Sequence, residues 1–173
     1  AHIEPPSQYN NVFFDASSGA GTVTVDAALA TCNSMTCTGA TLTLTGTSAK
    51  VFELYGSLTL AAGITWSYSG YFYFKSASAG NTITMAGKTF NSTSKVYYTG
   101  SGSWILQDNL STSGNFTVSA GTLDLNTKTL GISGGTTTFT SGTINNGTLN
   151  VTSSSKTFAG TTFGANVTIS GTS

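Results

Sequence analysis

Residues 104–132 read WILQDNLSTSGNFTVSAGTLDLNTKTLGI, and their apolar side chains come in pairs two positions apart. The pairs are Trp104/Leu106, Phe116/Val118, Leu123/Leu125 and Leu130/Ile132. A period of two places both members of a pair on the same side of a β-strand. The last three pairs start seven residues apart, which leaves room for one short strand and a corner but not for a hairpin. Three such segments make a turn of about 20 residues, the size expected of a β-solenoid rung.

The same spacing recurs along the chain, from residues 11–15 (NVFFD) and 22–26 (TVTVD) to residues 166–169 (NVTI). No window shows the 3.6-residue apolar stripe of an amphipathic helix. A second internal match aligns residues 56–65 with residues 114–123, and its offset equals three rungs of about 19 residues. The pattern therefore predicts an all-β chain folded as a right-handed parallel β-helix, a β-solenoid with about 20 residues per rung.

The main alternative is a sandwich or jelly roll of antiparallel strands. Hairpins in such folds favour Asn-Gly or Asp-Gly turns, and residues 146–147 form the only such dipeptide of the chain. A spacing of seven residues is also too tight for most sandwich strands with their turns. Both observations favour the solenoid.

The chain has 173 residues with six Lys, six acidic residues and no Arg, so its formal net charge is zero. Binding to nucleic acid depends on clustered Lys and Arg, so this composition argues against a nucleic-acid partner. No apolar run approaches the roughly 20 residues that span a bilayer, so we expect no membrane insertion. A surface rich in Thr, Ser and Asn and poor in Lys is typical of exported proteins, which predicts an extracellular, cell-surface location.

Residues 1–10 lie outside the repeating pattern. They contain both prolines of the chain, Pro5 and Pro6, which cannot continue a sheet ladder. We interpret this segment as a linker or as a cap over the first rung, and residues 11–173 as a single solenoid domain. The last strand-like run stops shortly before Ser173 without a capping segment. This ending suggests a fragment of a longer protein, with neighbouring solenoid segments or further copies of itself as partners.

Two cysteines, Cys32 and Cys37, lie close together in TCNSMTC. On one straight strand they would stand about 16 Å apart, beyond the reach of a disulfide. A turn at Asn33 and Ser34 would bring them together. The sequence leaves open whether they form a disulfide or two small buried core residues. Their spacing fits neither a redox motif nor a zinc site.

Several phrases of the sequence resemble repeat segments of very large extracellular surface proteins of Bacteroidota-type bacteria. These phrases are NNVFFDASSGAGTVTVDA, YGSLTLAAG and SWILQDNLSTSGNFTVSAGTLDLNTKTL, and the resemblance covers most of residues 11–132. Such segments are similar to the pectin-lyase-like right-handed parallel β-helix and occur in adhesins or cell-surface filaments. The resemblance implies that fold and an adhesive or structural role, and it brings no catalytic motif.

Candidate catalytic residues are few. Enzymes built on β-helices need clustered carboxylates for acid/base work or metal binding. The six acidic residues are spread along the chain, and Asp108 and Asp124 approach each other only if their rungs stack. Asp in coil corners usually binds backbone N–H groups, which is the role we expect here. The single histidine, His2, has no second His with which to form a metal pair or triad. We therefore predict a protein that is not an enzyme and holds no cofactor and no metal.

Tyrosines supply the candidate binding residues. In YFYFK, Tyr71 and Tyr73 alternate with phenylalanines, and in KVYY, Tyr97 alternates with Val96 and Tyr98. If the alternating partners point inward, the three tyrosines point outward. Tyr73 and Tyr97 are separated in sequence by little more than one rung, so we expect them to stack as neighbours. An exposed tyrosine ladder would offer flat faces to a surface glycan or a partner protein. The alternative is aromatic pairing that only stabilises the sheet.

Thr-x-Thr rows supply a further candidate surface. They are Thr22/Thr24, Thr41/Thr43/Thr45 and Thr82/Thr84. Such rows resemble the ice-binding surface of some solenoid antifreeze proteins. Their irregular spacing predicts that they fall on different faces, and Thr is also a common exposed strand residue.

Together these patterns predict a non-catalytic structural or adhesive segment of an extracellular bacterial surface protein or filament. The alternative is a carbohydrate-binding module that acts through Tyr71, Tyr73 and Tyr97. Ice binding through the Thr-x-Thr rows ranks behind both.

Overall fold

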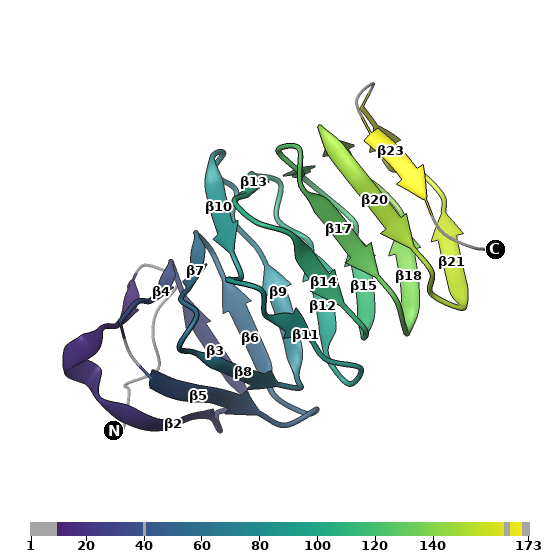
Figure 1. Cartoon of the computed structure of the whole chain (residues 1–173). Coiled ribbons are helices and arrows are strands. Elements are labelled where there is room, and N and C mark those ends of the chain that lie inside the picture. Colours follow the sequence, from purple (N-terminus) through teal and green to yellow (C-terminus); the bar gives the residue numbers. More distant parts are fainter. Residues whose placement is uncertain (1–9, 40, 165–166, 171–173) are drawn as a thin grey trace.

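The computed structural model describes residues 10–39, 41–164 and 167–170. Apart from one short 3-10 turn, η1 (Ala16–Ser18), its elements are all β-strands. They form about seven turns of a parallel β-solenoid with roughly 21 residues per turn. Figure 1 shows the strands stacked along the coil from the purple N-terminal turn to β23 at the other end. Parallel pairing throughout the described strands excludes the antiparallel sandwich and confirms the predicted solenoid.

The first face of the coil is an eight-stranded sheet to which each described turn contributes one strand. In order along the axis, the strands are β1 (Val12–Phe14), β4 (Met35–Cys37), β7 (Leu58–Leu60), β10 (Asn81–Thr84), β13 (Ser103–Leu106), β16 (Thr122–Asp124), β19 (Thr143–Asn145) and β22 (Thr162–Phe163).

The second face is divided into two sheets. The first three turns supply β2 (Ala20–Val25), β5 (Thr41–Gly46) and β8 (Thr65–Tyr68). The later turns supply β11 (Thr89–Phe90), β14 (Leu110–Thr112), β17 (Thr129–Ile132), β20 (Gly147–Val151) and β23 (Val167–Ser170).

The third face is a seven-stranded sheet. Its strands are β3 (Leu29–Cys32), β6 (Val51–Leu54), β9 (Tyr71–Phe74), β12 (Lys95–Tyr98), β15 (Asn115–Val118), β18 (Thr136–Phe139) and β21 (Ser155–Phe158). In most of these strands buried and partly exposed side chains alternate, as the period of two requires.

Residues 104–132 show how the sequence spacing builds one turn. Phe116 lies in β15 on the third face, Leu123 in β16 on the first and Leu130 in β17 on the second. All three side chains are buried. The seven-residue spacing therefore corresponds to one face, and three faces close one turn, as predicted.

The internal match between residues 56–65 and residues 114–123 does not mark whole turns. Leu58 lies in β7 on the first face, whereas Phe116 lies in β15 on the third. The early turns are longer than the rung that the match assumed, since Met35 pairs with Leu58 in the next turn. The offset of the match thus spans two turns and part of a third. The three faces share the same apolar-x-apolar pattern, so sequence alone confuses one face with another.

The core is a column of stacked side chains that runs along the axis inside the coil. In-register neighbours on the third face stack directly, as with Phe74 and Tyr98, whose ring centroids are 4.4 Å apart. Trp104 lies edge-on to both rings, is fully buried and donates its indole N–H to the carbonyl of Gly56, two turns earlier. Burial of such rings adds to the stability that the inter-turn backbone ladders give the coil.

One corner of the coil requires glycine in successive turns. Gly121 and Gly142 follow the third face in consecutive turns and have φ angles of +69° and +84°. A Cβ on Gly121 would lie 2.4 Å from the carbonyl oxygens of Gly100 and Gly102, one turn earlier. Close approach of backbone to backbone at this corner lets the hydrogen-bond ladder continue through it, and only glycine fits.

The second face has a seam between the third and fourth turns. β8 pairs with β5 and β11 pairs with β14, but no ladder joins β8 to β11. Side chains replace the missing ladder: Asn91 donates from Nδ2 and Ser94 from its hydroxyl to the carbonyl of Tyr68 at the end of β8. The rings of Trp66 and Phe90 meet edge to face across the seam at 5.4 Å.

Removing one ring from the core column should destabilise the coil strongly. We expect Phe116→Ala to lower the free energy of unfolding by about 3–5 kcal/mol, because the substitution removes a fully buried ring and leaves a cavity. The matched control is Thr117→Ala, the next residue, which points outward and should cost less than about 1 kcal/mol. Urea unfolding followed by circular dichroism measures both, and equal losses would contradict the inward and outward assignment.

Candidate functional site

The three predicted tyrosines come together on the outer side of the third face. Tyr71 and Tyr73 lie in β9, and Tyr97 lies in β12 directly above Tyr73 in the ladder register. The ring centroids of Tyr73 and Tyr97 are 4.7 Å apart with planes 13° from parallel, and Tyr71 lies 6.2 Å from Tyr97 at 8°. The predicted outward positions and stacking are confirmed. We call Tyr71, Tyr73 and Tyr97 the tyrosine stack.

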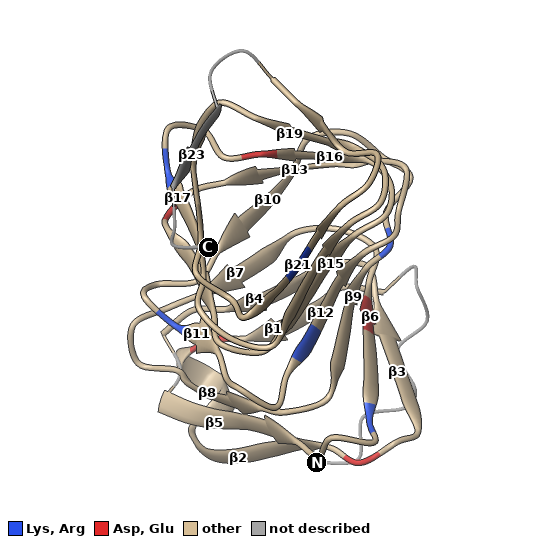
Figure 2. Ribbon diagram, turned by 90° about the vertical axis from the view of Figure 1, so that its right-hand side faces the viewer, with Lys and Arg blue, Asp and Glu red and all other residues tan. Residues whose placement is uncertain are grey.

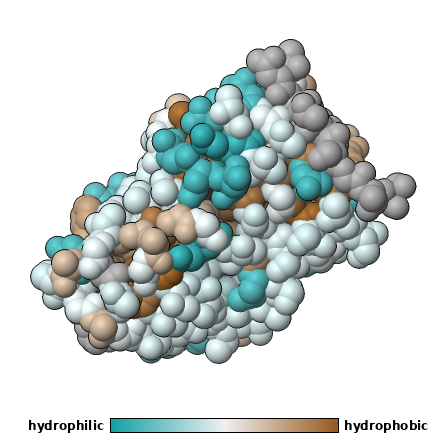
Figure 3. Space-filling model, viewed as in Figure 1, coloured by the Kyte–Doolittle hydropathy of each residue, from teal (hydrophilic) through white to brown (hydrophobic). Residues whose placement is uncertain are grey.

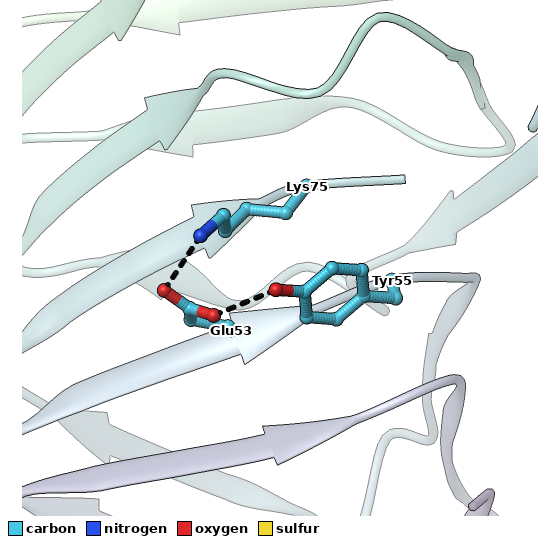
Figure 4. A network of polar contacts seen from close by, with 3 residues as sticks. All are labelled: Glu53, Tyr55 and Lys75. Carbon is cyan, nitrogen blue, oxygen red and sulfur yellow. Dashed lines mark hydrogen bonds and ion pairs between the residues drawn. The ribbon is translucent and has the colours of Figure 1, made fainter. Parts of the chain in front are cut away.

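Charged side chains flank the tyrosine stack on both strands and on β6. Glu53 pairs with Lys75 at 2.9 Å and accepts a hydrogen bond of 2.9 Å from the hydroxyl of Tyr55 (Figure 4). Lys95 places its ammonium 4.3 Å from the centre of the Tyr71 ring, within the range of a cation–π contact. None of these charged residues was predicted to belong to the site. Glu53 and Lys75 are 22 residues apart in sequence, about the length of one turn, and this spacing is the signal that could have indicated their contact.

The environment of the tyrosine stack favours neutral phenols. Partial burial raises the pKa of Tyr97, and the neighbouring Tyr73 and Tyr71 raise it further. The pKa of Tyr73 is raised by burial, then by Tyr71 and Glu53. A hydrogen bond to Glu53 raises the pKa of Lys75, which favours its charged ammonium. The pair is worth at most about 1 kcal/mol, because Lys75 keeps 35% of its side chain exposed.

One face of each ring in the tyrosine stack is occupied. Tyr73 and Tyr97 stack face to face, and Lys95 lies over Tyr71. The stack therefore offers a ligand hydroxyl-bearing ring edges beside an ammonium and an ion pair, with less open ring face than the flat platform expected from the sequence. The expected alternative, aromatic pairing across the turns, is present in the structure.

The two candidate carboxylates bind turns. Asp108 accepts hydrogen bonds from the backbone N–H groups of Met85, at 2.8 Å, and Ala86, at 2.5 Å, one turn earlier. Asp124 accepts from the N–H of Asn126 and from the side-chain amide of Asn146. This is the corner role predicted for them. Within the described ranges, no three His, Cys, Asp or Glu side chains come together to hold a metal ion. His2 lies outside the described residues.

Two of the Thr-x-Thr rows share a face, contrary to the prediction that the rows fall on different faces. Thr22 pairs with Thr43, and Thr43 pairs with Thr65 on the second face. In a second row beside this one, Thr24 pairs with Thr45, and Thr45 pairs with Ser67 in the next turn. Residues Thr82 and Thr84 lie in β10 on the first face, as expected for a separate row. Longer early loops bring the first two rows into register despite their irregular sequence spacing. Ice binding through them stays a prediction.

The two cysteines are free and fully buried. Cys32 ends β3 and Cys37 ends β4, so the chain turns from one face to the next at Asn33 and Ser34, which the sequence had left open. Burial raises the pKa of Cys32 to about 12, with a smaller contribution from Cys37, and raises that of Cys37 to about 11. In this structure both thiols are small core residues.

A small apolar cavity lies inside the early turns of the coil. Near the seam, Met35, Leu44, Phe52 and Trp66 line an apolar cavity of about 10 Å³, which is no larger than one water molecule requires. Among the described residues, no helix has the length and apolar character needed to cross a membrane.

The outer surface carries little charge. Figure 2 shows the Lys and acidic residues as isolated segments spread over the coil. The face drawn in Figure 3 is mostly pale, the colour of residues of intermediate hydropathy such as Thr, Ser and Gly. Glu53, Lys75 and Lys95 around the tyrosine stack thus stand out against an otherwise weakly charged exterior.

The fold and surface define a class of protein: a repeat-built parallel β-solenoid with a narrow apolar core and a weakly charged exterior rich in Thr and Ser. The family described as TamB C-terminal domain matches residues 78–173, more than half of the chain. The chain belongs to the TamB C-terminal domain family. Membership indicates a structural role in a protein of the bacterial envelope. No curated protein and no solved structure matches the chain.

Protection of the buried thiols should be lost at high pH. In the unfolded chain a thiol has a pKa of about 8.5, and burial in the folded protein raises it. The unfolded state therefore loses these protons first as pH rises, so the contribution of the thiols to stability is complete below about pH 8.5 and declines above it. We expect the free energy of unfolding to fall as pH rises from about 9 towards the pKa values of about 11 and 12 of Cys37 and Cys32. At pH 8, iodoacetamide should modify neither cysteine in the native protein and both in urea, as measured by intact mass.

The control for this measurement is the double variant Cys32→Ala, Cys37→Ala, which should show no alkylation and a flatter decline above pH 9. Native alkylation as fast as that in urea would contradict the burial. Fewer than two titratable thiols in unreduced, denatured protein would establish the disulfide instead.

Proposed function

We propose that this chain is a non-catalytic structural segment of an extracellular bacterial surface protein. The observation that carries the proposal is the backbone ladder, which joins each turn to the next on two faces without a break and on the third with one seam. A catalytic role would need convergent acids and bases, and Asp108 and Asp124 are each engaged in separate turns. The resemblance of residues 11–132 to surface-protein repeats and the envelope family support the extracellular location.

The same proposal includes neighbouring solenoid segments or further copies as partners. Phe158, in the last strand of the third face, stacks on Phe139 from one side and keeps 47% of its side chain exposed. Phe13 in the first turn is 65% exposed. Large apolar side chains with one open side are suited to stacking against another coil of the same kind.

A structural spacer should accept an additional turn. A second copy of residues 122–142 inserted after Gly142 adds one turn, because Thr122 and Thr143 are register partners. We expect the lengthened protein to fold with an unchanged circular dichroism spectrum and to be longer by about 4.8 Å, the spacing of neighbouring strands. In the bacterium, an epitope tag in the exposed loop at residues 77–80 should be reached by antibody on intact cells for both lengths.

Two results would contradict the spacer proposal. The first is a lengthened protein that folds but does not replace the original in cells. The second is a tag that antibody reaches only after the outer membrane has been permeabilised, which would place the segment inside the envelope. The untagged protein serves as the control for antibody specificity.

We propose surface-glycan binding at the tyrosine stack as the second candidate function. The observation that favours it is the cluster of Tyr71, Tyr73 and Tyr97 with Lys95 and Glu53 on a weakly charged exterior. Because the rings use one face each for contacts within the stack, a sugar would be bound mainly through hydrogen bonds to the phenol hydroxyls and the charged groups.

Glycan-array binding tests this second candidate. The joint replacement of Tyr71, Tyr73 and Tyr97 by Ser should abolish saturable binding. Joint replacement by Phe keeps the stacked rings, removes only the hydroxyls and should weaken binding at least tenfold, the value of one or two hydrogen bonds. The control is Thr117→Ser with Thr138→Ser on the same face. Binding that survives the Ser variant excludes the tyrosine stack.

A further inference from the structure

The junction between the third and fourth turns is joined by fewer backbone ladders than its neighbours. The first face crosses it through β7 and β10, and the third through β9 and β12. The second face has its seam here, where no ladder joins β8 to β11. A repeat coil separates most easily at its weakest interface, because its stability is a sum of contacts between neighbouring turns.

Two rings of the tyrosine stack span this same junction. Tyr73 belongs to the third turn and Tyr97 to the fourth, and they are in-register partners. Their centroids are 4.7 Å apart and their planes are 13° from parallel. Both side chains are partly exposed, so small oxidants in solution have access and the rings have room to tilt.

We propose that Tyr73 and Tyr97 form an oxidative cross-linking site, at which a carbon–carbon bond between the two rings ties the third turn to the fourth. The co-reactant is a peroxide, used by a haem peroxidase. Each phenol loses one electron and its hydroxyl proton, and the two phenoxyl radicals couple at ring carbons ortho to oxygen. The two ring protons then move to the oxygens and restore both phenols. Overall, two tyrosines and one hydrogen peroxide give one dityrosine and two waters.

The structure selects this pair over the other tyrosines around it. Tyr98 stacks on Phe74 at 4.4 Å, but a phenylalanine ring cannot supply a phenoxyl radical and Tyr98 is fully buried. Tyr68 is also buried, and its hydroxyl donates to the backbone carbonyls of Lys50 and Tyr71. Tyr71 is farther from Tyr97, at 6.2 Å, and lies on the diagonal of the ladder. Tyr73 and Tyr97 combine the shortest tyrosine separation with access from solvent.

The bond would strengthen the junction where a ladder is missing. In the unfolded chain it closes a loop of one turn that runs from Tyr73 to Tyr97. By the loop-entropy relation used for disulfides, such a link shifts the folding equilibrium about 300-fold towards the folded state. This function is independent of glycan binding and adds covalent reinforcement to the structural role.

Treatment of the folded protein with hydrogen peroxide and a haem peroxidase tests the site. We expect blue dityrosine fluorescence in a product that runs as a monomer on a denaturing gel, with an intact mass lower by two hydrogen atoms. Peptide mapping should find the link between the peptides that contain Tyr73 and Tyr97. The thermal unfolding midpoint of the product should lie above that of the untreated protein.

Single replacements by Phe keep the stacked rings and hence the fold. Tyr73→Phe and Tyr97→Phe should each abolish the intramolecular product, whereas the control Tyr71→Phe should retain it. A product that persists in Tyr97→Phe, a link mapped to Tyr71, or a wild-type protein that yields only intermolecular dimers or no dityrosine would overturn the assignment. An unchanged unfolding midpoint in the mapped product would overturn the reinforcing role.

Discussion

The in-register parallel backbone ladder is the interaction on which the rest of this structure depends. Because each residue of a paired strand is matched with the residue one turn away, its side chain lies directly above a partner in the neighbouring turn. Inward positions therefore become columns, as with Phe72 over Phe52 and Tyr98 over Phe74. Outward positions become columns too, and Tyr73 under Tyr97 is one of them. The core and the candidate site follow from the same register.

The ladder also sets the chemistry of the corners. Where the ladder does not continue through a corner, polar side chains from neighbouring turns satisfy the unpaired backbone groups. Asp108 binds two N–H groups of the turn below, and Ala86 there adopts a positive φ of 50°. Asn91 and Ser94 bind the carbonyl of Tyr68 at the seam. Short polar and acidic side chains thus complete the hydrogen bonding of these corners.

The sequence reveals the fold because the period of two and the spacing of seven are local patterns. It predicted the outward tyrosines for the same reason, and it left the corner between Cys32 and Cys37 open. It missed β3 (LATC) and β4 (MTC), because small or sulfur-containing residues fill their inward positions, and β14 (LST), where Thr112 takes one of the two inward positions. It predicted a mean turn of about 20 residues, close to the observed value of roughly 21, but not how turn length varies, which depends on how far each loop bulges. The alignment of Thr22 with Thr43, the misread internal match and the ion pair of Glu53 and Lys75 all depend on that length.

The seam connects these observations to the family relationship. The match to the TamB C-terminal domain begins at residue 78, just before β10 opens the fourth turn. The seam lies between the third and fourth turns, so the matched part of the chain starts where the second face starts a new sheet.

The large rings of Trp66 and Phe90 meet at the seam, and the tyrosine stack crosses the same junction on the outer side. Aromatic residues are thus concentrated where a backbone ladder is missing. Ring stacking offsets part of the lost hydrogen bonding, which accounts for the position of the tyrosine stack without any ligand. A binding role for the stack therefore has to be shown by an effect of the hydroxyls, because the rings already have a structural one.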